Sequence, residues 1–207
     1  MKTEIDKILG SWEDVVNACR ATVAKPPLGH EPSGAFKNAI LISEHSPIRE
    51  IIVKWSWPKI KSWVATHWSR HKWECYIQTQ RTDRTGVNRD DLPQSAEVSF
   101  CGSANVQHLI DTFRKRLCAG QVSPETREYA MDFKATLAYE EPEISNVLVP
   151  NCVYRGGCPE LNPCDHWAKF YAWVKALHDV DVRTLPIKKR YAYYHEYFYS
   201  EVYNGDE

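Results

Sequence analysis

The chain has 207 residues, of which 43% are hydrophobic, and we expect a single domain over residues 1–207 with a sizeable apolar core. Its formal net charge of −1 predicts no general attraction to nucleic acid or anionic membranes, so any anion site must be a local cluster. No apolar run approaches the length of a membrane span, and the charged N-terminal residues do not resemble a signal peptide. Together with seven scattered cysteines, this predicts reduced thiols and a cytoplasmic location.

The N-terminal part of the chain reads as two helices followed by two strands. Ser11 can cap the first helix, in which apolar residues recur at helical spacing as far as Val23. Ala35–His45 predicts a second, short helix. Glu50–Trp57 alternates between apolar and polar residues, which is typical of a half-buried strand, and β-favouring residues return in Trp73–Gln80.

The segment between these two strands predicts a helix, because Pro58 suits a first helical turn. Four residues at spacings of four, three and four would share one face of it: Ile60, Val64, His67 and His71. The basic triplet Arg70-His71-Lys72 would then end the helix. Cations are favoured at a helix C-terminus, by typically under ~1 kcal/mol each.

The rest of the chain is predicted to be mainly helical after a long polar loop over Gln80–Ser95, which carries Arg81, Arg84 and Arg89. Helices are expected at Ser103–Gly120, from Ser123, from Pro142, from Pro163 with Asn162 as the cap, and from Pro186. The last of these is rich in tyrosine. Tyrosines at helical spacing could stack on bases, but we expect them to belong to the core.

We expect no metal site. His67 and His71 form half of a helical metal site, but Trp68 stands where a metalloprotease would carry glutamate, which favours two hydrogen-bonded, partly buried histidines. Near His166 the cysteines recur every six residues, which is too wide for a zinc knuckle: Cys152, Cys158 and Cys164. Cys75, close to Lys72, is the best candidate for an activated thiol.

Four short elements follow one another in a fixed order: His45-Ser46-Pro47-Ile48-Arg49-Glu50, Arg70-His71-Lys72, Leu148-Val149-Pro150 and Asp181-Val182-Arg183. In order and spacing they resemble the flavin-dependent thymidylate synthases, whose elements read H-x-S/T-P-F-E-H, R-H-R, R-x-x-L-P and A-Q-x-E-I-R. The resemblance runs from about Ser11 to Arg183. It implies an α/β fold with a central, mostly antiparallel sheet covered by helices, which agrees with the alternating periods of about two and 3.6 residues.

The resemblance also implies a function: transfer of a one-carbon unit from methylenetetrahydrofolate to C5 of a pyrimidine deoxynucleotide, dUMP or a variant such as dCMP. FAD would be the cofactor, NADPH a further co-substrate, and a homotetramer the assembly. The positions implied to contact FAD are Glu50, Arg70, His71, Lys72 and Asn162. Those implied to contact the nucleotide are His67, Gln78, Gln80, Arg81, Arg84, Asn146 and Trp173.

Several of these positions depart from the family pattern. Lys72 replaces the second arginine of the triplet, Gln80 a serine and Glu50 a histidine, while arginines are replaced by Thr82, Asn146 and Trp173. Each lost charge-assisted bond costs on the order of 1.5–3 kcal/mol. We therefore expect Arg81, with Arg84 or Arg89, to supply the lost phosphate-binding charge. The alternative functions are a non-catalytic nucleotide-binding or interaction protein and, more remotely, a zinc hydrolase using His67 and His71.

Overall fold

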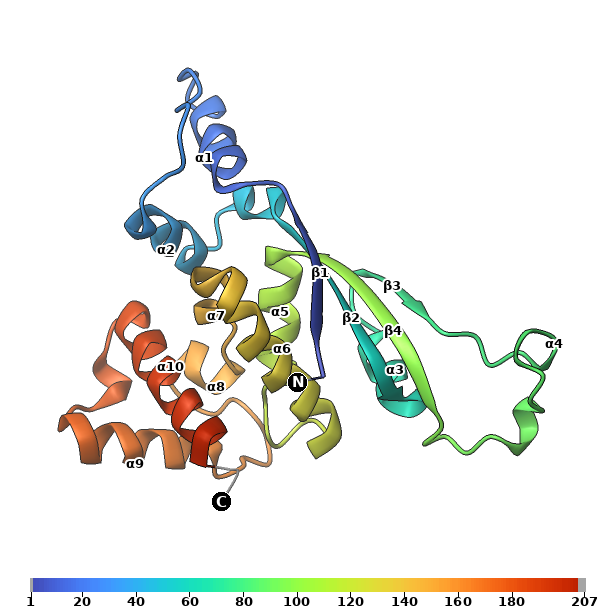
Figure 1. Cartoon of the computed structure of the whole chain (residues 1–207). Helices are drawn as coiled ribbons and strands as arrows, with labels where there is room; N and C mark the ends of the chain where they lie inside the picture. The colour runs from blue at the N-terminus through green and yellow to red at the C-terminus, as the bar shows by residue number, and fades with distance from the viewer. Residues whose placement is uncertain (1, 205–207) are drawn as a thin grey trace.

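The computed structural model describes residues 2–204 and contains a four-stranded, entirely antiparallel sheet (Figure 1). The strand order is β1-β2-β4-β3, with β1 at Glu4–Leu9, β2 at Ile52–Lys61, β4 at Glu97–Asn105 and β3 at Glu74–Ile77. Helices surround it, so the expected α/β class with an antiparallel sheet is confirmed. The connection from β3 to β4, residues 78–96, extends away from the helices (Figure 1), and we call this segment the arm.

The helical elements lie in chain order around the sheet. The α-helices are α1 (Trp12–Ala21), α2 (Gly34–Ile42), α3 (Ser62–Trp68), α4 (Thr82–Thr85), α5 (Val106–Arg116), α6 (Pro124–Glu140), α7 (Pro142–Val147), α8 (Asn151–Arg155), α9 (His166–His178) and α10 (Ile187–Asn204). Three 3-10 turns complete the set: η1 (Ser46–Glu50), η2 (Arg89–Asp91) and η3 (Val182–Thr184). None of the described helices is long and apolar enough to cross a membrane.

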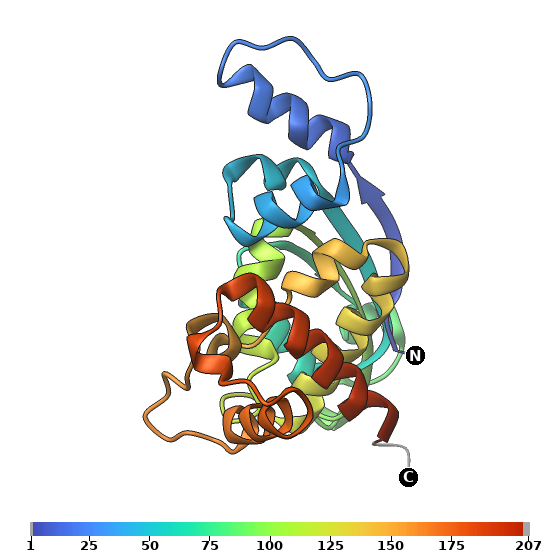
Figure 2. The same ribbon diagram turned by 90° about the vertical axis from the view of Figure 1, so that its left-hand side faces the viewer.

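One face of the sheet carries the core. Alternate residues of β2 and β4 are buried, including Val53, Trp55 and Phe100, whereas Lys54 and Cys101 on the opposite face are exposed. The buried face packs against α3, α5 and α6, and α10 forms an outer layer against α7, α8 and α9 (Figure 2). This one-sided burial is what an antiparallel sheet allows and explains the period of two in β2.

An aromatic cluster fills the space under the sheet. The indole of Trp55 contacts Trp57, Trp73 and Phe133, with ring centroids 5.0–5.8 Å apart. Gly102 lies opposite Trp55 in the ladder, and a Cβ there would come within 2.2 Å of the indole. A glycine is thus required on β4 because the ring occupies the place of its side chain.

The helix predicted from Pro58 is wrong at its start. β2 continues through Pro58 to Lys61, and the register of β2 against β4 shifts between Trp57 and Ile60. A β-bulge of this kind tolerates proline because the ladder is already interrupted there. Helix α3 therefore begins only at Ser62, so Ile60 belongs to the sheet and the basic triplet follows the helix end.

Two strands and one helix start escaped the sequence analysis. β1 is half-buried between charged residues, and β4 buries small residues, which weakens the apolar alternation in both. The expected helix Ser103–Gly120 begins at Val106, because Asn105 ends β4 and its side chain accepts from the His108 amide. The strand expected at Trp73–Gln80 is confirmed but is limited to Glu74–Ile77.

Other expectations are borne out in part. Ser11 and Ser123 cap their helices, and the tyrosine-rich helix places Tyr194 in the core, as expected. Val23 is 61% exposed beyond the end of α1. The cap expected at Asn162 is wrong: α9 begins at His166, and the loop before it packs Cys164 against Gly120. That list of differences concerns helix ends, not the existence of the helices.

Gly102→Ala tests the close approach of β4 to Trp55. We expect a loss of about 1–3 kcal/mol in the free energy of unfolding, because the added methyl overlaps the buried indole. Gly157→Ala is the matched control, since nothing lies within 4 Å of a Cβ at that position. Urea denaturation of both variants gives the comparison, and equal stability would contradict this account of the core.

A second prediction concerns Lys134 of α6, which is fully buried, donates to the Ser145 carbonyl and lies 5.1 Å from the Phe198 ring centroid. Burial lowers its pKa from 10.5 to about 7. Between these values the unfolded chain binds more protons than the folded one, so stability should rise with pH above about 7. In Lys134→Met this rise should be weaker, by up to about 1.4 kcal/mol per pH unit.

Chemical denaturation between pH 7 and pH 9 is the measurement for Lys134→Met. Parallel curves for the variant and the parent would show that Lys134 does not titrate in this range in the folded protein.

Candidate functional site

Two packed tryptophans hold the basic triplet at the surface. Trp68, the last residue of α3, is buried, and the Trp73 indole Nε1 donates to the Trp68 carbonyl at 2.9 Å. The two rings stack with centroids 5.8 Å apart and an interplanar angle of 17°. Residues 69–72 form the turn between them, so Arg70 and Lys72 remain exposed. The triplet is thus part of a closed turn rather than of the helix that the sequence predicts.

Arg116 of α5 connects this turn to the helix before it. Its Nε donates to His71 Nε2 at 2.6 Å, and its Nη2 donates to the His67 carbonyl at 2.6 Å. Burial, followed by the charges of Arg116 and Lys115, lowers the pKa of His71 to about 4. His71 is therefore neutral near pH 7, and the proton of its ring lies on Nδ1, since Nε2 accepts from Arg116.

A pocket of about 490 Å³ opens beside the triplet, and we call it the triplet pocket. It is lined by Arg70, His71, Lys72, His108, Asp111, Thr112, Arg114, Lys115, Asn151, Tyr154 and Arg155. Cations outnumber its single carboxylate in a protein whose net charge is −1. Such local density favours a ligand with phosphate groups, because charge-assisted hydrogen bonds are stronger than neutral ones.

Helices α5 and α8 supply the wall opposite the triplet, which the sequence analysis did not identify. Arg114 forms an ion pair with Glu44, and its guanidinium carbon lies 3.7 Å from the Tyr154 ring centroid. Arg155 donates to Asn151 at 3.1 Å. The run of basic residues at the end of α5 was the available signal, but only the fold shows that it faces the triplet. A further space of about 340 Å³ continues past His71 to Cys118 and Glu160.

A second pocket lies on the other side of Arg70, at the base of the arm, and we call it the arm pocket. Its volume is about 440 Å³, and it is lined by Ser62, Trp63, Thr66, His67, Arg70, Gln80, Arg89, Leu92, Pro93 and Gln94. The His67 Nδ1 lies 3.2 Å from the Thr126 hydroxyl, which fixes the ring. Arg70 lines both pockets, so one guanidinium lies between two sites suited to polar ligands.

The structure brings together the expected residues of the triplet with His67 and Gln80, but several expected arm residues lie elsewhere. Gln78 accepts from the Ser99 amide across the β3–β4 connection. Arg81 and Arg84 are both exposed and both pair with Asp83, at 2.9 Å and 3.7 Å. Neither arginine lines the two pockets described above.

The remaining expected residues lie in other parts of the fold. Glu50 ends η1 and Asn162 lies in the loop before α9, both exposed. Asn146 of α7 is half-buried, and Trp173 of α9 packs against Tyr197 with centroids 5.6 Å apart. None of them lines the triplet pocket or the arm pocket.

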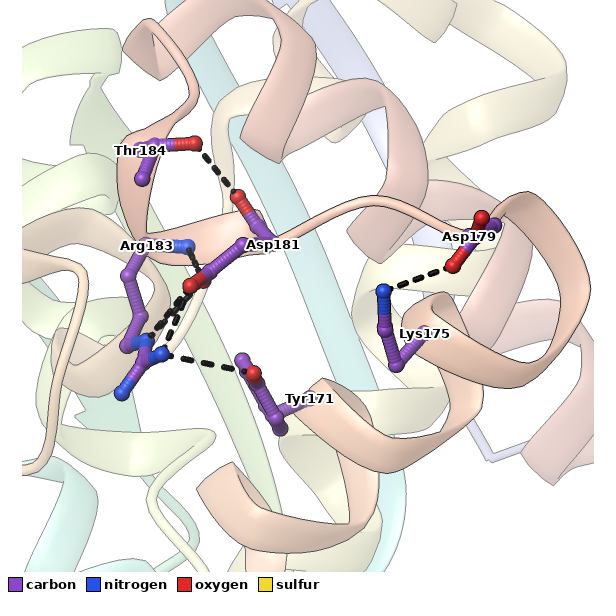
Figure 3. A network of polar contacts seen from close by, with 6 residues as sticks. All are labelled: Tyr171, Lys175, Asp179, Asp181, Arg183 and Thr184. Atoms are coloured by element: carbon purple, nitrogen blue, oxygen red, sulfur yellow. Dashed lines mark hydrogen bonds and ion pairs between the residues drawn. The ribbon is translucent and has the colours of Figure 1, made fainter.

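The element Asp181-Val182-Arg183 closes on itself. The Arg183 guanidinium donates to the Asp181 carboxylate through Nε and Nη2, and Nη2 also lies 3.4 Å from the Tyr171 hydroxyl (Figure 3). Beside it Lys175 pairs with Asp179 at 2.6 Å (Figure 3). These contacts pin the turn between α9 and α10, and they give Arg183 a structural partner outside the two pockets.

Among residues 2–202, whose side chains the structure describes, no group of three or more His, Cys, Asp or Glu residues could hold a metal ion. His67 and His71 each have a protein partner, Thr126 and Arg116. Burial, with a neighbouring carboxylate, raises the pKa of the Cys75 thiol, which disfavours the thiolate needed by a nucleophile.

No protein-family model matches the chain, and no curated protein matches it significantly. Solved structures do share its fold. A UMP/dUMP methylase, PolB from Streptomyces cacaoi bound with 5-Br dUMP, has a TM-score of 0.57 at 14% identity over 70% of this chain and 93% of its own. The flavin-dependent thymidylate synthase ThyX from Helicobacter pylori, complexed with FAD and dUMP, has a TM-score of 0.57 at 11% identity over 70% and 97%.

Arg116→Gln tests the electrostatics of the triplet turn. Glutamine keeps a hydrogen-bond donor but removes a positive charge beside His71, so the pKa of His71 should rise from about 4. It should stay below 6.5, because burial is the larger cause of the shift. NMR titration of the ring measures it, with Arg183→Gln as the control. An unchanged His71 pKa in the Arg116 variant would show that this charge does not act on the ring.

Proposed function

We propose that the protein binds FAD and a pyrimidine nucleotide and transfers a one-carbon unit to C5 of the pyrimidine. The observation that carries this proposal is the position of Arg70 between the triplet pocket and the arm pocket. A reaction between a cofactor and a nucleotide requires both to be held in contact and in a fixed orientation. Two adjacent pockets that share a cation meet that requirement.

The residues of the triplet pocket fit an anionic dinucleotide. Arg70, Lys72, Lys115 and Arg155 provide charge for phosphate groups, and the neutral His71 adds a hydrogen-bonding group without further repulsion. The pocket and its continuation past His71 have volumes within the range of about 300–1,000 Å³ that is usual for ligand sites. When bound there, FAD would supply the hydride and carry the one-carbon unit.

The arm pocket fits a mononucleotide. Trp63 offers an aromatic surface against which a pyrimidine can stack, and the amide groups of Gln80 and Gln94 can donate to and accept from a base edge. Arg70 would reach towards a ligand in either pocket. These side chains bind and orient the nucleotide, while His67, held by Thr126, restricts its position from the helix side.

The fold shared with a UMP/dUMP methylase and a flavin-dependent thymidylate synthase supports this assignment over an unrelated binding function. We further propose methylenetetrahydrofolate as the one-carbon donor, NADPH as the reductant and a homotetramer as the assembly. The nucleotide is a pyrimidine deoxynucleoside monophosphate, dUMP or dCMP. The altered positions of the arm leave a non-catalytic nucleotide-binding protein as the second candidate, since Thr82 and Gln80 replace charged or smaller family residues.

Three alanine variants separate the two pockets. Arg70→Ala should weaken both FAD and dUMP, by on the order of 1.5–3 kcal/mol each, because it removes a shared charged donor. Lys72→Ala should weaken FAD alone, and Gln80→Ala should weaken dUMP alone, since each lines a single pocket. Flavin absorbance after desalting and calorimetric titration with dUMP give the two affinities.

Arg183→Ala is the control, because this exposed arginine pairs with Asp181 outside both pockets. A parent protein that binds neither FAD nor dUMP would overturn the proposal. A parent that binds both, and releases methylated nucleotide when methylenetetrahydrofolate and NADPH are added, would support the enzyme. Binding of both without product, measured by mass spectrometry, would select the non-catalytic alternative.

A further inference from the structure

We propose that Arg89, at the start of η2 in the arm, binds the 5′-phosphate of the nucleotide in the arm pocket and takes the place of an arginine that the chain lacks at Thr82. This inference rests on the proposed function and names the phosphate-binding residue of that site. Three arginines lie in the arm, and the structure distinguishes them by their partners and by their positions relative to the pocket.

Arg81 and Arg84 are already engaged. Arg81 forms a paired contact with Asp83 through Nε and Nη2, at 3.0 Å and 2.9 Å, and Arg84 approaches the same carboxylate at 3.7 Å. Both contacts lie within or next to α4, away from the arm pocket. A phosphate would have to displace Asp83 to reach either guanidinium, which reduces the gain from binding.

Arg89 differs in both respects. It lines the arm pocket together with Arg70, and in the described part of the chain its guanidinium has no carboxylate within ion-pair distance. The residues that line this pocket include no Asp or Glu. Asp90 and Asp91 follow Arg89 in the turn, but Asp91 accepts from the Asn88 side chain at 3.0 Å, and neither lines the pocket. The arm pocket therefore presents two arginines to a dianionic phosphate.

The backbone of Arg89 is held in place by Thr82. The Arg89 amide donates to the Thr82 hydroxyl at 3.1 Å, which ties η2 to α4 across the loop. Asn88 caps η2, with its side chain accepting from the Asp90 amide at 3.3 Å, and the Leu92 amide donates to the Arg89 carbonyl. Thr82 stands at the position where the family resemblance implies an arginine. The chain thus has a hydroxyl at that position, which anchors an arginine seven residues later in the sequence.

The test compares two arginines of the same loop. Arg89→Ala should weaken dUMP binding about 10- to 100-fold, the effect of losing one charge-assisted hydrogen bond, while Arg84→Ala should leave it within about twofold of the parent. Calorimetric titration of the full-length protein with dUMP gives both values. Deoxyuridine, which lacks the phosphate, is the second probe, and its affinity should be the same for the Arg89 variant and the parent.

Thr82 provides an independent arm of the experiment. Thr82→Val removes the hydroxyl that accepts from Arg89 and should weaken dUMP binding, whereas Thr82→Ser keeps it and should bind like the parent. The assignment is overturned if the parent binds dUMP and Arg89→Ala binds it equally well, and the proposed function then still stands. If the parent does not bind dUMP at all, the proposed function fails and this inference fails with it.

Discussion

The packing of two tryptophans determines where the chemistry of this protein can lie. Trp68 and Trp73 stack against each other beneath the sheet, and the Trp73 indole donates to the carbonyl that ends α3. Trp55 contacts Trp73 from the sheet above, and Gly102 makes room for that ring. The turn between the two tryptophans has no freedom to bury itself, so its basic residues must point outwards. Each aromatic pair adds about 0.5–1.5 kcal/mol beyond its buried area, so the turn is fixed by the core itself.

The same arrangement explains how so many cations can lie together in a protein with a net charge of −1. Arg114 is compensated by Glu44 and stacks on Tyr154, so it contributes to the wall without adding a free charge. Arg116 uses its hydrogen bonds on His71 and on the end of α3. These neighbours keep His71 neutral near pH 7. The free charge that remains belongs to exposed side chains at the pocket mouth, where water lowers the cost of repulsion between them.

The arm pocket depends on this fixed turn as well, because Arg70 forms part of both pockets. Its opposite wall comes from a loop that is held by its own hydrogen bonds and not by the core. Such a loop can exchange one phosphate-binding residue for another without disturbing the sheet. A fold shared with nucleotide methylases at 11–14% identity is consistent with that division between a retained framework and altered binding residues.

The sequence alone determined most helices, the central strand β2 and the importance of the basic triplet, because caps, apolar spacing and local charge are properties of neighbouring residues. It could not determine β1 or β4, whose residues alternate too weakly and which become strands only by pairing with β2. It also placed Pro58 in a helix, since the bulge that accommodates this proline is a feature of the β2–β4 ladder. Only the tertiary structure brought α5 and α8 opposite the triplet and separated Arg89 from Arg81 and Arg84. Which side chains face a common pocket depends on contacts between segments distant in sequence, and no local pattern encodes that choice.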